Sequence, residues 1–176
     1  TRNRRVALAA VVILAATPTH AVRTAIGFAD HHAFDYVWLG VTALSAVKLV
    51  NRNASDEFGG SLDHSNVVWI GILSVGVAAQ VLAWNAGPIL LLPLAFYGVF
   101  RALTAIKHGS SLRADSQLVV GVLIGGIFSM VAHFTLGWQQ LYIVSTPIIL
   151  AIGLGAVFIL GEASRRRQLS PVIFSS

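Results

Sequence analysis

Three polar side chains, His20, Gln80 and His133, interrupt long apolar stretches of this 176-residue chain. Each lies about 15 to 17 residues from one end of its stretch. At a helical rise of 1.5 Å per residue, the three would therefore sit at similar depth in parallel helices. A polar or ionisable group at membrane depth is costly and usually faces a bundle interior or a wet cavity. The spacing predicts one polar cavity shared by these residues.

Two kinds of chemistry fit such a cavity. Imidazoles that titrate near neutral pH can serve a proton or ion path, with Gln80 as a hydrogen-bonding partner. Alternatively, His20 and His133 from two helices can ligate one b-type haem. The structural alternative is that both histidines lie near the interface, bonded to carbonyls or reaching toward headgroups. The sequence leaves all three open.

A second candidate is the polar stretch 27–35, which we predict to be a loop. It holds Asp30, His31, His32 and Asp35, four candidate metal ligands within six residues. Carboxylate and imidazole donors suit zinc or another divalent transition metal. Their spacing matches no recognised metal motif, and the alternative is an ordinary solvated loop.

The elements that must position these residues are membrane helices. Hydrophobic residues make up 56% of the chain and charged residues 11%, with a mean hydropathy of +0.77. A soluble domain carries about 25% charged residues. The chain has no cysteine, which excludes disulfides, thiolate metal sites and cysteine nucleophiles. Basic residues lie at the ends of apolar stretches without aromatic interleaving, so nucleic acid is not an expected partner.

The apolar stretches predict an all-α, polytopic transmembrane bundle of six spans arranged as three hairpins. Each long stretch is close to the roughly 20 residues needed to cross a bilayer. The whole chain, 1–176, is interpreted as a single integral membrane domain. The first stretch also resembles a cleaved secretory signal peptide, with a basic start and a small-x-small end. The predicted spans are 6–28, 36–51, 66–84, 88–107, 117–136 and 141–161.

The distribution of basic residues predicts the orientation. If the N-terminus lies in the cytoplasm and six spans follow, eleven of the twelve Lys and Arg residues fall on the cytoplasmic side, and only Arg23 falls outside. This is the positive-inside pattern, and it predicts that both termini are cytoplasmic (N-in/C-in). Within this arrangement Arg101 reaches the headgroup level, where Asp115 or Glu162 can pair with it.

Small residues and prolines indicate where helices approach or bend. Gly121 and Gly125 form a G-x-x-x-G pattern, which allows close helix packing within the chain or across a homodimer. Pro93 and Pro147 fall inside predicted spans, where each can kink its helix.

The sequence favours a non-enzymatic multi-pass protein of the cytoplasmic (plasma) membrane. The chain contains no Walker loop, no G-x-S-x-G and no H-E-x-x-H, and its acidic residues lie outside the predicted spans. The leading hypothesis is a small channel or transporter, or an integral subunit of a larger membrane complex. The alternatives are a b-haem electron-transfer subunit and a purely structural membrane protein. Its expected partners are the lipid bilayer and either further copies of the chain or other membrane subunits.

Overall fold

The computed structural model describes residues 31–53, 63–83, 87–112, 115–137 and 141–167. Within these ranges the chain is helical and contains no β-strand, which confirms the all-α prediction. The elements are α3 (His31–Asn53), α4 (His64–Ala83), the 3₁₀ helix η1 (Gly87–Leu91), α5 (Leu92–His108), α6 (Ser116–Thr135) and α7 (Leu141–Arg166).

Four helical segments are long and apolar enough to cross a membrane: His64–Ala83, Gly87–His108, Ser116–Thr135 and Ile143–Arg166. They correspond to the last four predicted spans. The predicted second span falls within α3, whose apolar part, Tyr36–Asn51, is shorter. The predicted first span, 6–28, lies outside the described residues. The chain is therefore a multi-pass membrane protein.

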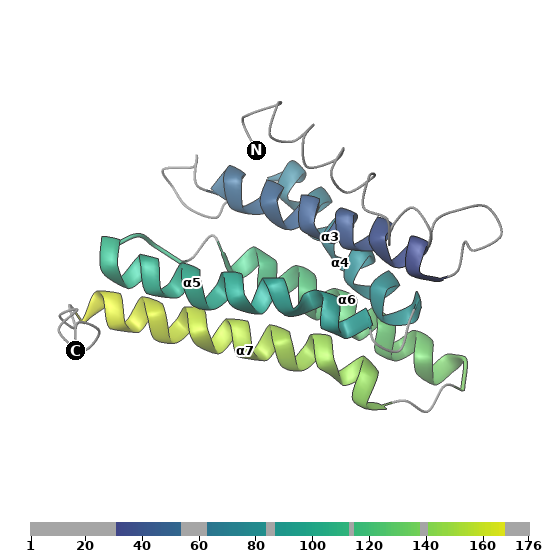
Figure 1. Ribbon diagram of the computed structural model, residues 1–176. Coiled ribbons are helices and arrows are strands. Elements are labelled where there is room, and N and C mark those ends of the chain that lie inside the picture. The colour runs from purple at the N-terminus through teal and green to yellow at the C-terminus, as the bar shows by residue number, and fades with distance from the viewer. Residues whose placement is uncertain (1–30, 54–62, 84–86, 113–114, 138–140, 168–176) are drawn as a thin grey trace.

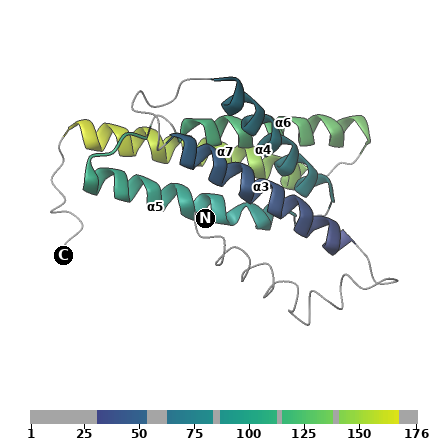
Figure 2. The ribbon, with the colours of Figure 1, turned by 90° about the horizontal axis from the view of Figure 1, so that it is seen from above.

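The helices pack in the order α3, α4, α6, α7 and α5. Figures 1 and 2 show α5 running beside α7, and α6 is the middle helix of this order. The ends of α3, α5 and α7 lie at the same end of the bundle as the starts of α4 and α6. Hydrophobic core clusters lie between neighbouring helices. One surrounds Leu73 and Val122, and another surrounds Ala105 and Phe158.

The outer faces of the helices are apolar. Phe96 on α5 is 73% exposed and Ile159 on α7 is 71% exposed, and many other large hydrophobic side chains are exposed on every helix. Water would disfavour such a surface, whereas lipid tails match it. The exposed apolar faces therefore agree with the membrane assignment.

Local signals explain several helix ends. Asp63 precedes α4, and its Oδ1 accepts a 2.7 Å hydrogen bond from the backbone N–H of Asn66, as an N-cap does. α5 ends at Gly109, whose φ of 69° is the left-handed conformation that glycine adopts at little cost.

Pro93 lies within the predicted span but at the start of an α-helix rather than in its interior. It lies in the first turn of α5, where its missing N–H would have no helical partner in any case. The preceding turn, Gly87–Leu91, is a 3₁₀ helix instead. Pro147 does lie inside α7 and is fully buried.

The predicted loop 27–35 is also corrected. α3 begins at His31, so His31, His32 and Asp35 belong to a helix rather than to a loop. Polarity alone predicted the loop, but a helix continues wherever its backbone hydrogen bonds can form, including beyond the apolar part of a span. Positions 31 and 35, four residues apart, now share one helix face.

Candidate functional site

The charged residues of the structure gather at one end of the bundle. All seven Lys and Arg residues in the described ranges lie toward this end, which we call the basic end: Lys48, Arg52, Arg101, Lys107, Arg165, Arg166 and Arg167. The other end of the described helices carries none. This asymmetry is of the kind that the positive-inside rule describes.

A polar cluster at the basic end centres on Asp115, which directly precedes α6 and is only 3% exposed. The hydroxyl of Tyr97 donates a 2.8 Å hydrogen bond to its Oδ1. Nε of Arg101 lies 3.1 Å from its Oδ2, forming an ion pair without an aligned hydrogen bond. Tyr97 and Arg101 are four residues apart and thus share one face of α5. Of the two predicted partners of Arg101, the structure selects Asp115.

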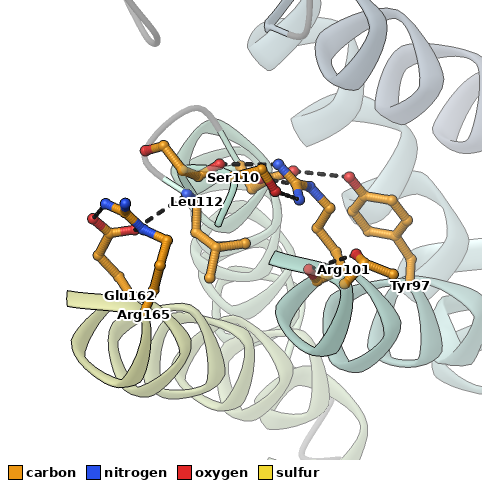
Figure 3. A network of polar contacts seen from close by, with 9 residues as sticks. Tyr97, Arg101, Ser110, Leu112, Glu162 and Arg165 are labelled. Atoms are coloured by element: carbon orange, nitrogen blue, oxygen red, sulfur yellow. Dashed lines mark hydrogen bonds and ion pairs between the residues drawn. The ribbon is translucent and has the colours of Figure 1, made fainter. Parts of the chain in front are cut away.

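The rest of the Arg101 guanidinium holds the α5–α6 connection. Nη1 donates to Oγ of Ser110 and Nη2 donates to the carbonyl of Ser111, each at 2.9 Å. Figure 3 shows the Arg101 side chain reaching from α5 toward Ser110. All three guanidinium nitrogens of Arg101 thus contact groups of the protein. The cluster therefore links α5 to the start of α6 and leaves no guanidinium nitrogen for a ligand.

The electrostatic state of Asp115 follows from its surroundings. Burial raises the pKa of this carboxyl group above its usual value of 3.8, and the Tyr97 hydrogen bond and the Arg101 charge only partly oppose the effect of burial. A buried carboxylate with one cation and one hydroxyl partner is thus tolerated but not strongly stabilised.

A second cluster ties α7 to the same connection. The carboxylate of Glu162 accepts hydrogen bonds from Arg165 through Nε at 3.1 Å and through Nη2 at 2.5 Å. Arg166 Nε donates to it at 3.1 Å, and the backbone N–H of Leu112 donates at 3.4 Å. Figure 3 shows Glu162, Arg165 and Leu112 beside the Arg101 cluster.

Two of the three predicted cavity residues lie in the bundle interior. Gln80 on α4 is 0% exposed and His133 on α6 is 4% exposed, and these two helices pack together. Both amide atoms of Gln80 lack a hydrogen-bond partner among the described residues. Nδ1 of His133 lies 3.3 Å from the carbonyl of Ser129. His20 lies outside the described residues, so the shared cavity remains a prediction.

The predicted G-x-x-x-G residues face α4 within the same chain. A Cβ atom at Gly121 would meet the Leu73 side chain at 2.6 Å, and one at Gly125 would meet the Ser74 carbonyl oxygen at 2.6 Å. Ser74 Oγ also donates a 3.0 Å hydrogen bond to the carbonyl of Gly121. Both glycines thus allow α4 and α6 to approach closely.

The structure describes the backbone of only three of the four predicted metal ligands. His31, His32 and Asp35 belong to α3, and Asp30 lies outside the described residues. Among the side chains that the structure does describe, no group of three or more His, Cys, Asp or Glu residues is arranged to hold a metal ion.

Sequence reasoning did not find the role of Tyr97 in the Asp115 cluster. The signal was present in the four-residue spacing of Tyr97 and Arg101 and in an acidic residue at the start of the next helix. The contact itself joins positions 18 residues apart, from α5 to the residue that precedes α6.

Comparison with known protein families identifies the family to which the chain belongs. The family model described as "Oligosaccharyl transferase STT3, N-terminal" matches residues 1–176. No curated protein and no solved structure matches the chain. Because the match covers the whole chain and the described part is a bundle of membrane helices, the chain belongs to the oligosaccharyl transferase STT3 family, N-terminal region.

Proposed function

We propose that the chain is a membrane-embedded part of an oligosaccharyl transferase and serves the transfer of an oligosaccharide to an acceptor. The family match over residues 1–176 is the observation that carries this proposal. It favours a role in an enzyme over the small channel or transporter predicted from the sequence. The predicted role as an integral part of a larger membrane assembly is compatible with it.

The chemistry of glycosyl transfer indicates which residues to test. As in glycoside hydrolysis, cleavage of a glycosidic bond develops positive charge on the sugar and negative charge on the leaving group. A divalent cation bound nearby would act as a Lewis acid toward that leaving group. The donor set Asp30, His31, His32 and Asp35 is of the type that binds such a cation. Positions 31 and 35 are one helical turn apart at the start of α3, which is compatible with shared ligation.

A complementation experiment tests the transferase role. Cells that lack the gene would be supplied with the wild-type protein or with single variants, and glycans on their proteins would be measured by mass spectrometry. We expect glycans to be lost without the gene and restored by the wild type. His31→Ala and Asp35→Ala should restore less than a tenth of the wild-type level, at equal protein abundance in the membrane.

The matched control is His64→Ala, because His64 is an exposed histidine at the opposite end of the bundle. It should restore wild-type glycosylation. Unchanged glycans in cells without the gene would refute the transferase role. Full activity of both the His31 and Asp35 variants would refute only the metal site.

The topology completes the proposal. Six spans with both termini in the cytoplasm would place the start of α3 on the outer side of a cytoplasmic membrane. The one-sided distribution of the described basic residues supports this orientation. Association with further copies or with other membrane subunits is proposed from the family's enzymatic role.

A polar cavity formed by His20, Gln80 and His133 is a second proposal, supported by the buried amide of Gln80. An unpaired amide in a membrane interior costs free energy unless a further polar group meets it. Because the chain has no cysteine, His20→Cys with His133→Cys can be tested directly by oxidative cross-linking. We expect a cross-link for this pair and none for His20→Cys with Val131→Cys, since Val131 is exposed on α6.

The alternative proposal is that His20 and His133 ligate a haem. A visible absorption spectrum of the purified protein would show a Soret band if His20 and His133 ligate a haem. A cross-link without such a band would support the polar cavity alone. The absence of both would leave the interfacial interpretation of the histidines.

A further inference from the structure

A groove lies between α6 and α7 at the basic end. Its volume is about 550 Å³, and it opens toward the outside of the bundle. One part is lined by the apolar side chains Val119, Val120, Phe158 and Ile159, and the other part by Ser116, Glu162 and Arg166. Val120 and Ile159 are also exposed on the lipid-facing surface. The lining therefore changes from apolar to polar along one groove, as an amphiphile does.

The polar part of the groove holds one guanidinium group that its counter-charge does not fully engage. The groove lining includes the guanidinium of Arg166 and the carboxylate of Glu162, and Arg165 pairs with the same carboxylate. Arg165 makes two hydrogen bonds with this carboxylate and neutralises it. Arg166 uses only Nε toward Glu162, and its side chain is 64% exposed. Its Nη1 and Nη2 thus remain available to a ligand, as far as the described residues are concerned.

We propose that this groove binds one anionic phospholipid, with its phosphate at Arg166 and an acyl chain along Val119, Val120 and Ile159. Arginine matches a phosphate group through paired N–H donors. Basic pockets between membrane helices bind anionic headgroups by the same electrostatics. This lipid site is separate from the proposed transferase chemistry. That chemistry is assigned to the start of α3, at the other end of the bundle.

The helix ends determine which groups can hold the headgroup. The last turn of α7 presents backbone carbonyls, which disfavour a bare anion, so the guanidinium groups must supply the attraction. The first turn of α6, where Ser116 lies, presents N–H groups that favour an anion. The side chain of Asp115 does not compete there, since it is engaged with Tyr97 and Arg101.

Two variants separate the tail and headgroup parts of the site. Gly155→Leu fills the groove from within, because a Cβ atom at Gly155 meets only Val119 Cγ1, at an ordinary 3.6 Å. Its control is Gly153→Leu, since Gly153 is exposed two residues away and does not line the groove. Arg166→Gln removes the headgroup contact. Its control is Lys107→Gln, an exposed basic residue at the end of α5.

The experiment is native mass spectrometry of protein purified from vesicles of equal phosphatidylglycerol and phosphatidylcholine with the same acyl chains. We expect the wild type and both controls to retain one phosphatidylglycerol in preference to phosphatidylcholine, by at least fivefold. Gly155→Leu should lose the retained lipid, and Arg166→Gln should lose the preference. In nanodiscs, phosphatidylglycerol should raise the Tm of the wild type but not of Gly155→Leu.

Three outcomes would overturn the proposal. Equal retention of both lipids by the wild type would mean that the groove holds only general surrounding lipid. Wild-type retention by Gly155→Leu would place the bound lipid elsewhere. Equal loss in Lys107→Gln and Arg166→Gln would indicate a diffuse basic surface instead of this site. If Gly155→Leu unfolds, the Arg166→Gln comparison with Lys107→Gln decides alone.

Discussion

At the scale of single residues, Asp115 shows how burial and pairing compete. Its carboxylate is almost fully buried, yet it is placed at the end of the bundle next to one cation and one hydroxyl. A pKa raised by burial means that the folded protein binds this proton more tightly than the unfolded chain does. Ionisation of Asp115 therefore lowers the stability of the fold.

We predict that stability depends on pH through this residue. As pH rises through the usual value of 3.8, the unfolded chain loses the proton first, so the stability contributed by Asp115 falls until pH exceeds its raised folded pKa. Asp115→Asn has no such proton. The Tm of the wild type minus that of Asp115→Asn, measured in detergent from pH 4 to 8, should thus decrease as pH rises.

A control variant distinguishes the carboxyl group from its surroundings. Tyr97→Phe removes the hydrogen bond that lowers the pKa of Asp115, so the same decrease should persist and extend to higher pH. A Tm difference that stays constant over the whole range would contradict the raised pKa.

At the scale of elements, the contact between α4 and α6 organises the bundle. These two helices start at the same end of the bundle and are neighbours in the packing order, and their backbones approach closely at Gly121 and Gly125. Ser74 shares its hydroxyl between the carbonyls of Ile70 and Gly121, so the interface also includes a hydrogen bond between the helices. Such close contacts replace the hydrophobic driving force that a lipid environment does not supply.

We predict a graded response to alanine at the two glycines. At Gly125 the added Cβ would meet a backbone oxygen, which cannot move alone, whereas at Gly121 it would meet the flexible end of Leu73. Gly125→Ala should therefore destabilise the protein by about 1–3 kcal/mol, and Gly121→Ala by less. Thermal unfolding in detergent measures both.

Gly71→Ala is the matched control, because nothing lies within 4 Å of a Cβ at this exposed position on α4. It should leave stability unchanged or raise it by up to about 1 kcal/mol through helix propensity. If Gly125→Ala were as stable as this control, the close approach of α4 and α6 would be wrong.

At the scale of the whole molecule, the described basic residues are distributed unevenly between the two ends of the bundle. The described Lys and Arg residues all lie toward the basic end, while the lipid-facing surfaces are apolar. A membrane with an anionic inner leaflet and a translocation barrier for basic residues would hold this end on the cytoplasmic side.

We predict that Ser176 is cytoplasmic and that the connection between α6 and α7 is outside. In the cysteine-free chain, single cysteines at Ser176 and Gln139 can be treated with a membrane-impermeant thiol reagent on intact cells. Gln139→Cys should be labelled before lysis and Ser176→Cys only after it. Labelling of Ser176→Cys in intact cells would reverse or abolish the proposed topology.

The sequence by itself determined that the protein is an all-α membrane protein and where its last four spans lie. Apolar length predicted the spans, so the four predicted spans from residue 66 onward agree closely with the structure. The G-x-x-x-G pattern also identified Gly121 and Gly125 as positions of close helix packing, and the structure places both against α4. Polarity misjudged the start of α3 at His31, because helix ends depend on backbone hydrogen bonds as well as on composition.

Only the tertiary structure decided which residues meet. The pairing of Tyr97 and Arg101 with Asp115, the burial of Gln80 and His133 on adjoining helices, and the groove between α6 and α7 all depend on how helices are rotated and ordered. Helices that are apolar on every side give no sequence signal for the direction each one faces, because lipid and protein interior are equally apolar. Their contacts are set by close packing and by a few polar groups, which act only once the helices are side by side.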